Sequence, residues 1–459
     1  MIGHNHSGLI MNRPKNILIL LSLFILALQP AFSQTQDIAE ERAYQVAKGM
    51  YQDQLYDLAA GQLQDFLSKY RSSRYAEEAQ FLLAECFFQM GEYPKAVTAF
   101  EKFLTNYAGL GLRDKAQFRI SEALIKAGKF KDALASLEAF FQAHPSSPLL
   151  PNAQYWYGEA LYQTDQPQKA LSYYARAFKS DPQGPLADYA LFSTGYIYEE
   201  LQQWDEAVAA YKNIIKQYPN SPLLDQATYR IGFVEFGRKN YDQALDELSG
   251  AIRSFPNSTL RSKAQYFIGD IFYKNREYDK AIKAFTVIAA LPENDYADDA
   301  QYSLAWVYFD QADYEKAAAA FQNVAAMSKD AALVASSLFQ AGRNLKQLGR
   351  KSEAGSLYKK VISDYPDSPE TANALYEMAS IDFEDKNYQG ALTNFKKIVQ
   401  DFPDSRLASE AAIMVGECYF AENNFSQAKQ AFQSAMQQYR DEATLKKACL
   451  AWLKLFSAK

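Results

Sequence analysis

Residues 218–252 read YPNSPLLDQATYRIGFVEFGRKNYDQALDELSGAI, and two related segments follow them directly. Residues 255–285 read FPNSTLRSKAQYFIGDIFYKNREYDKAIKAF, and residues 291–321 read LPENDYADDAQYSLAWVYFDQADYEKAAAAF. Self-similarity at a fixed period of about 20–50 residues is typical of stacked supersecondary units. These segments therefore predict a repeat architecture rather than a set of independent globular domains.

A single alanine marks this repeat along the chain, and it recurs in steps of 37 residues with one step of 36. It occupies Ala59, Ala96, Ala133, Ala170, Ala207, Ala244, Ala281, Ala317, Ala354, Ala391 and Ala428. A large apolar residue follows four positions later in every copy, and an aromatic ring precedes it by three in most copies. Residues three and four apart share one helical face, so the pattern predicts a helix with a crossing point at the alanine.

A second series of small residues lies twelve positions before these alanines. Six of its eleven members are glycines, namely Gly158, Gly195, Gly232, Gly269, Gly342 and Gly416. Glycine inside a helix costs about 1 kcal/mol relative to alanine. We therefore expect a second helix in each unit that approaches its neighbour closely at this position.

Proline-containing turns such as HPSSP, YPNSP and YPDSP separate the units. The proline is expected to end the outgoing helix. Ser147, Ser221 and Ser368 are expected to cap the next helix at its N-terminus, followed by proline at its first position.

The pattern of Gly or Ala, Tyr-x-x-Ala and Phe or Tyr resembles the tetratricopeptide repeat (TPR), although the family unit has about 34 residues. The resemblance implies an all-α fold, a right-handed superhelical solenoid of about eleven helix pairs over residues 34–440. Residues 441–459 form one last helix that is expected to cap the core. The chain is similar to exported bacterial envelope TPR proteins, of the barrel-assembly lipoprotein and Tol–Pal-associated types. It lacks the lipid-anchor cysteine of the former and the N-terminal coiled coil of the latter, so only the fold and a broad role carry over.

Residues 1–33 are expected to be a signal peptide, with Met11 as a possible true start. Arg13 and Lys15 precede an apolar run from Ile17 to Leu28, and small residues precede a cleavage position before Gln34. An uncleaved membrane anchor is the alternative, but twelve residues span only about 18 Å as a helix. We expect an exported protein, periplasmic or associated with the outer membrane, with no membrane span after cleavage and no lipid anchor.

Composition argues against several functional classes. The net charge of -6 and the pI of about 5.4 disfavour nucleic-acid binding. Of three histidines, His4 and His6 fall in the expected signal peptide, which leaves His144 alone. The three cysteines, Cys86, Cys418 and Cys449, lack metal-ligand spacing and are expected to be buried. The sequence predicts no catalytic, cofactor-binding or metal-binding residues and therefore no enzyme.

TPR arrays that resemble this chain bind partners along a concave groove lined by the first helix of each pair. Aromatic residues recur at two positions that would face this groove. The candidate residues among them are Tyr155, Tyr162, Tyr229, Tyr266, Tyr273 and Tyr302. Such rings offer large contact area for extended peptides. The alternative is that they belong to the core within each repeat, although a hydroxyl favours an open position for the tyrosines.

Charged residues also occur at expected groove positions. Glu85, Glu122 and Glu159 recur in consecutive repeats, whereas Arg343 and Lys346 occur farther along the chain. Separated charges could orient a ligand by electrostatic complementarity. The alternative is an ordinary solvated helix face.

The sequence thus predicts a non-catalytic scaffold or adaptor in the bacterial cell envelope that binds other envelope proteins or extended peptides. The alternative function is a structural or export component that binds cell-wall polymer or polysaccharide. The identity of the partner and the oligomeric state are left open.

Overall fold

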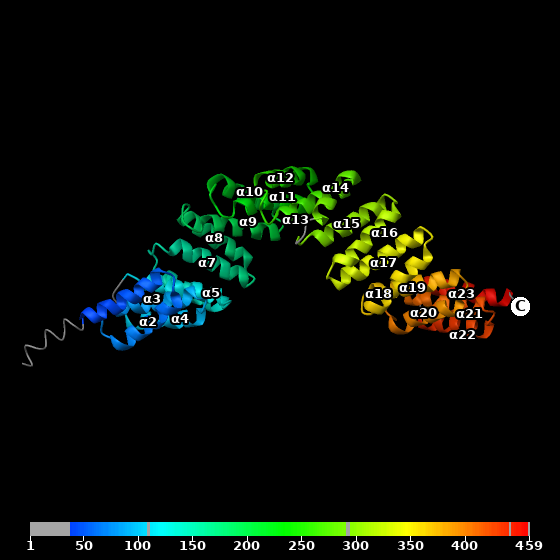
Figure 1. The fold of residues 1–459 in the computed structure, drawn as a ribbon, viewed down its shortest axis with the longest axis horizontal. Coiled ribbons are helices and arrows are strands. Elements are labelled where there is room, and N and C mark those ends of the chain that lie inside the picture. The colour runs from blue at the N-terminus through cyan, green and yellow to red at the C-terminus, as the bar shows by residue number, and fades with distance from the viewer. Residues whose placement is uncertain (1–36, 108–110, 291–293, 440–441, 458–459) are drawn as a thin grey trace, which may run out of the picture. The chain divides into compact units, whose positions relative to one another are not determined.

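The computed structural model describes residues 37–107, 111–290, 294–439 and 442–457. Within these ranges the chain is helical between turns, without a β-strand (Figure 1). The all-α expectation is confirmed. The chain divides into a unit that ends at Ala227 and a unit that begins at Thr228. The expected signal peptide, residues 1–33, lies outside the described residues.

The first unit begins with helical residues 37–52. Its further helices are α2 (Tyr56–Lys69), α3 (Ala76–Gln89), α4 (Tyr93–Asn106), α5 (Arg113–Lys126), α6 (Phe130–Ala143), α7 (Leu150–Gln163), α8 (Pro167–Ser180), α9 (Ala187–Glu200) and α10 (Trp204–Gln217). Helix α11 (Leu224–Gly237) contains the boundary between the units.

The second unit continues in the same way. Its helices are α12 (Tyr241–Ser254), α13 (Arg261–Lys274), α14 (Tyr278–Ala289), α15 (Ala297–Asp310), α16 (Tyr314–Met327), α17 (Ala331–Gln347), α18 (Lys351–Asp364), α19 (Glu370–Glu384), α20 (Tyr388–Asp401), α21 (Ala408–Ala421), α22 (Phe425–Gln438) and α23 (Glu442–Ser457).

Consecutive helices pack against each other from α2 to α10 in the first unit and from α12 to α23 in the second, which confirms the expected helix pairs. Odd-numbered helices are the first helices of the pairs, and even-numbered helices are the second. First helices also contact each other directly, as α5 does with α7 and α21 with α23. Each unit therefore presents a face built from its first helices.

The two series of small residues lie where the helices of a pair meet. All eleven marker alanines are fully buried. A Cβ atom added to Gly158 would lie 2.6 Å from Cε1 of Tyr174, and one added to Gly269 would lie 2.6 Å from Cε1 of Phe285. The close approach predicted for the glycines is confirmed. The contact is with the large residue four positions after the alanine.

The turn inside each pair depends on one residue in the left-handed conformation. Three of these residues are the glycines Gly91, Gly128 and Gly349. The others are Gln54, Asp165, Gln202, Lys239, Arg276, Ala312, Lys386 and Asn423, with φ between 57° and 64°. At Gln202 the turn is closed by bonds from the Gln202 amide to the Glu199 carbonyl (3.0 Å) and from the Gln203 amide to the Tyr198 carbonyl (2.8 Å). This is the Schellman pattern that ends many helices.

The turns between pairs differ from expectation in one respect. Helix α6 ends before Pro145 and α18 ends before Pro366, as predicted. Ser147 and Ser368, however, do not cap the following helices, because α7 begins at Leu150 and α19 at Glu370. The Ser147 hydroxyl accepts a bond from the Leu149 amide (3.1 Å) and donates one to Asp114 Oδ2 (2.6 Å). Ser221 bonds in the same way with Leu223 and Asp188. These serines hold the turn and tie it to the preceding repeat.

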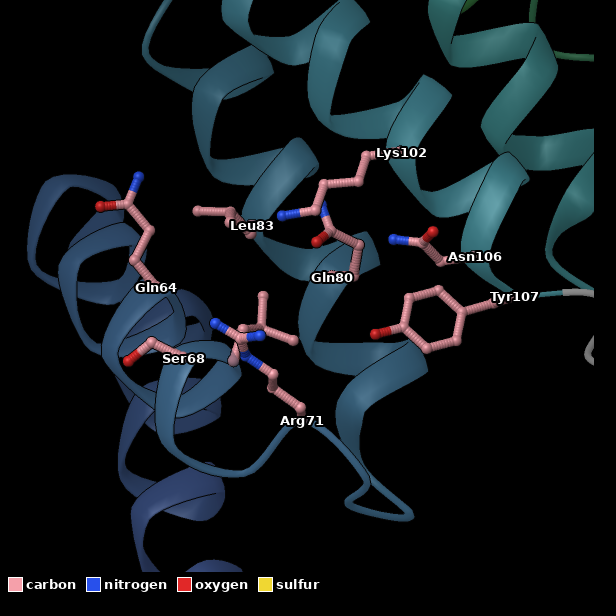
Figure 2. Close-up of a pocket in the computed structure, with 9 residues that line it drawn as sticks. Gln64, Ser68, Arg71, Gln80, Leu83, Lys102, Asn106 and Tyr107 are labelled. Carbon is pink, nitrogen blue, oxygen red and sulfur yellow. The ribbon is translucent and has the colours of Figure 1, made fainter.

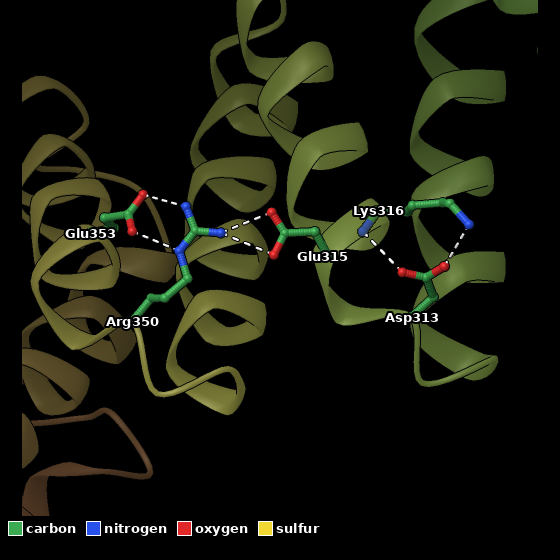
Figure 3. Close-up of polar contacts among 5 residues, drawn as sticks. All are labelled: Asp313, Glu315, Lys316, Arg350 and Glu353. Carbon is green, nitrogen blue, oxygen red and sulfur yellow. Dashed lines mark hydrogen bonds and ion pairs between the residues drawn. The ribbon is translucent and has the colours of Figure 1, made fainter.

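The segment 327–360 departs from this turn type. Helix α17 is longer than its equivalents at 17 residues, and Asp330 caps it by accepting bonds from the Ala332 and Leu333 amides. Arg350, just before α18, binds Glu315 on α16 at 2.8 Å and Glu353 on α18 at 2.6 Å (Figure 3). Lys316 pairs with Asp313 within α16 and its cap. Exposed ion pairs of this kind contribute about 0–1 kcal/mol each.

Candidate partner-binding groove

Four of the candidate tyrosines are half-buried, and each bonds to the following repeat. The hydroxyl of Tyr162 donates to the Glu200 carboxylate (2.8 Å), and that of Tyr273 donates to Asp310 Oδ2 (2.8 Å). The hydroxyls of Tyr266 and Tyr302 share hydrogen bonds with Ser303 and Ser336. The polar ends of these tyrosines thus join neighbouring repeats. Their rings also contact other rings of the protein, as Tyr266 does with Phe285 and Tyr302 with Phe321.

Tyr155 and Tyr229 are buried, with 7% and 0% exposure, in contrast to the open position expected for a tyrosine. The Tyr229 hydroxyl donates to the backbone carbonyl of Phe255 (3.0 Å). Burial, together with the charge of Glu159, raises the pKa of Tyr155 above its ordinary range. An intramolecular partner satisfies the hydroxyl of Tyr229 inside the core, so the hydroxyl alone did not indicate exposure.

The expected acidic series is largely paired within the protein. Arg119 binds both carboxylate oxygens of Glu85, at 2.9 and 3.0 Å, and also binds Glu122 at 2.9 Å. Glu85 is only 2% exposed. Glu159 accepts hydrogen bonds from Tyr174 (2.6 Å) and Ser193 (2.9 Å). Arg119 lies one turn of helix before Glu122, a spacing that could have revealed it in the sequence.

The two basic candidates differ from each other. Lys346 pairs with Glu377 on the next first helix at 2.8 Å. Arg343 is exposed and donates a long hydrogen bond to Gln340 (3.3 Å). Of these two cations, Arg343 is the one that a partner could reach directly.

Three first helices of the second unit, α19, α21 and α23, together line an open apolar depression. We call it the C-terminal groove. Its volume is about 440 Å³. It is lined by Phe383, Glu410, Ile413, Met414, Glu417, Lys447, Leu450 and Ala451. Lys447 and Glu410 form an ion pair across it at 3.2 Å, and Leu450 is 56% exposed. Phe383 and Ile413 stand at the two recurring groove positions, but the sequence did not single out this end.

The cysteines show no feature of a reactive site. Burial raises the pKa of Cys86 and of Cys418 to about 12, so both thiols stay protonated at neutral pH. Cys449 is exposed, contrary to expectation, and its Sγ lies 3.5 Å from Sδ of Met436 on α22. The described residues include no cluster of His, Cys, Asp and Glu suited to a metal ion. Across the same residues no helix has the length and apolar character needed to span a membrane.

Sequence models of one repeat family match most of the chain. The tetratricopeptide repeat-like domain matches residues 16–192. Further tetratricopeptide repeat models match residues 189–221, 229–296, 299–327, 336–368 and 382–451. The chain belongs to the tetratricopeptide repeat proteins. Repeats of this family generally mediate protein–protein interactions and typically form non-catalytic scaffolds, and no catalytic family is indicated.

Several solved structures match this chain at low sequence identity. A tetratricopeptide repeat protein from Parabacteroides merdae is 16% identical, with 57% of this chain and 98% of that chain covered and a TM-score of 0.36. A MamA RS-1 double mutant is 20% identical over 39% of this chain and 93% of that chain, with a TM-score of 0.34. A chain of the Naa15/Naa10 complex bound to HypK is 16% identical over 90% of this chain and 66% of that chain, with a TM-score of 0.36. No curated protein matches the sequence.

Proposed function

We propose that this protein is a non-catalytic scaffold of the bacterial cell envelope that binds partner proteins on the face of its first helices. The C-terminal groove is the observation that carries this proposal. Leu450 is open to solvent there and Phe383 and Met414 are half-buried, whereas most other candidate groove residues already bond within the chain. An apolar depression with charged groups at its rim suits a short amphipathic segment of a partner.

The charged rim would give such a segment its orientation. Lys447 and Glu410 are about half exposed, so their ion pair can open at little cost. Each could then bind an opposite charge on the partner. The exposed Leu450 and the half-buried Met414 would supply the apolar contact between them.

The envelope location rests on the sequence of residues 11–33, with its basic start, apolar run and small residues before Gln34. Expression of the full chain in a bacterium with an outer membrane tests it. Mass spectrometry of the protein from the periplasmic fraction should give a mature N-terminus at Gln34. Recovery of the uncleaved chain from the cytoplasm would contradict the proposed location.

Affinity capture with the mature chain tests the binding function. A defined protein partner should be recovered from an envelope extract, and Leu450→Asp should abolish its capture. Leu58→Asp is the matched control, because Leu58 on α2 is also 56% exposed but lies outside the groove. Retention on peptidoglycan or glycan beads without a protein partner would instead favour the polysaccharide function.

A further inference from the structure

The first unit contains a second, chemically different depression, which we call the N-terminal cleft (Figure 2). It has a volume of about 600 Å³ and lies between the second helices α2 and α4, over the first helix α3. Its floor includes Gln80 and Leu83 on α3. These positions face away from the groove positions Phe81, Glu85 and Phe88 on the same helix. The cleft is therefore separate from the face of the first helices.

Four side chains around this cleft can donate hydrogen bonds, and two of them are cations. Arg71 extends from the turn after α2, Lys102 and Asn106 from α4, and Tyr107 from the end of α4. Figure 2 shows the guanidinium, the ammonium, the Asn106 amide nitrogen and the Tyr107 hydroxyl all directed toward the middle of the cleft. Burial, with the charge of Glu77, raises the pKa of Tyr107, so its hydroxyl keeps its proton at neutral pH.

The two cations of the cleft differ from other basic residues of the first unit in their charge partners. Among the described residues, neither Arg71 nor Lys102 forms an ion pair, unlike the nearby Arg119 and Lys95. Gln80 is 2% exposed and uses its amide nitrogen to bond the Ala99 carbonyl (3.0 Å), which fixes the floor. A cationic, donor-rich cleft of this kind favours an anionic ligand that carries oxygen acceptors.

One cation of this cleft departs from the pattern of the repeats. Arg71 stands where later repeats carry the turn prolines Pro145, Pro182 and Pro219, in steps of 37 residues. In the next repeat, the positions of Lys102 and Asn106 hold Ala139 and Ala143. The position of Lys102 also carries a cation in other repeats, at Arg176, Lys360 and Lys397, so Arg71 is the cleft residue that departs from what most repeats carry.

We propose that the N-terminal cleft binds a carboxylate-rich segment of a partner protein, with Arg71 and Lys102 as the charged contacts. The cleft is wide and open, and its donors come from separate helices. Several carboxylates spread along a chain match this distribution better than one compact phosphate does. The inference rests on the proposed protein-binding function, and it adds a second contact of opposite chemistry to the apolar C-terminal groove.

Fluorescence anisotropy with a labelled polyglutamate peptide tests the proposal on the full mature chain. Exchange of both cations, Arg71→Gln with Lys102→Gln, should weaken binding by about tenfold or more. Asn106→Asp, which leaves both cations in place, should weaken it as well through repulsion. The control Lys131→Gln alters an exposed lysine on α6, outside the cleft, and should leave binding unchanged. Added salt should weaken binding by the wild-type chain.

Several results would overturn the assignment. One is that the wild-type chain shows no detectable binding of the peptide. Another is that the double variant binds the peptide as tightly as the wild-type chain does, with an unchanged helical circular dichroism signal. Binding of inorganic phosphate to the same chain is measured as a comparison. If it binds the cleft more tightly than the peptide does, the ligand is a free phosphate and not an acidic segment. Loss of envelope-partner capture with retained peptide binding would refute the proposed function alone.

Discussion

Among single residues, the glycines of the first helices make the sharpest prediction about stability. Gly158→Ala places a Cβ 2.6 Å from the Tyr174 ring, so the mutation should destabilise the fold by about 1–3 kcal/mol. Gly61→Ala on α2 meets no atom within 4 Å and should stabilise by up to about 1 kcal/mol. Thermal unfolding followed by circular dichroism measures both. Equal effects of the two substitutions would contradict the close packing at Gly158.

Arg119 leads to a second prediction at this scale. Arg119→Met leaves the carboxylate of Glu85 buried without its cation, at a cost of about 3–5 kcal/mol. The double variant Arg119→Met with Glu85→Gln should recover much of this loss, because the buried charge is gone. Urea unfolding of the single and double variants measures the difference. A double variant as unstable as Arg119→Met would show that Arg119 acts through packing alone.

The sequence predicted the burial of single residues well where side-chain size decides the packing. It predicted burial poorly where a hydrogen-bond or ion-pair partner from another part of the chain decides it. Marker alanines and glycines follow from the period, since the same helix crossing recurs in every repeat. The burial of Tyr229 could not be inferred, because the Phe255 carbonyl that accepts its hydrogen bond lies in another turn. In the same way, Glu85 resembled a free groove charge until Arg119, 34 residues away, was placed beside it.

At the scale of elements, α23 provides a prediction about the end of the second unit. It packs on α21 and α22, and it buries Ala448 and Ala451. Deletion of residues 441–459 should lower the thermal midpoint and increase amide hydrogen exchange in residues 408–438. Leu450→Asp with Leu453→Asp is the control, because both side chains are 56% exposed and should matter little for stability. Unchanged exchange in α21 and α22 would refute the role of α23 as a cap.

Helix ends were predicted less reliably than helices themselves. The proline rhythm located the ends of second helices, since proline restricts the residue before it. The left-handed residue inside each pair escaped notice, because only three of these eleven residues are glycines. The backbone hydrogen bonds of the Schellman turn hold a residue such as Gln202 in this conformation despite its side chain.

At the scale of the whole chain, the repeat number and the pairing of helices followed from the period, because stability in such arrays is nearly a sum over neighbouring repeats. The hydrophobic clusters agree, since each joins residues of adjacent repeats, as from Tyr44 to Cys86. The two candidate binding places were not predictable in this way. The C-terminal groove depends on side chains of α23 such as the exposed Leu450, and the N-terminal cleft depends on Arg71, which stands in place of a turn proline.

Buried tyrosines in several repeats predict how the stability of the whole chain responds to high pH. Burial raises the pKa of Tyr51 and of Tyr376 to about 12, and raises that of Tyr174 still further, against about 10 in an unfolded chain. The folded chain therefore holds protons that the unfolded chain releases, so the stability present below about pH 10 is lost as the pH rises through the folded values. The thermal midpoint should fall from about pH 9 to about pH 11. Tyr174→Phe should flatten this slope, and a midpoint independent of pH over that range would refute the explanation.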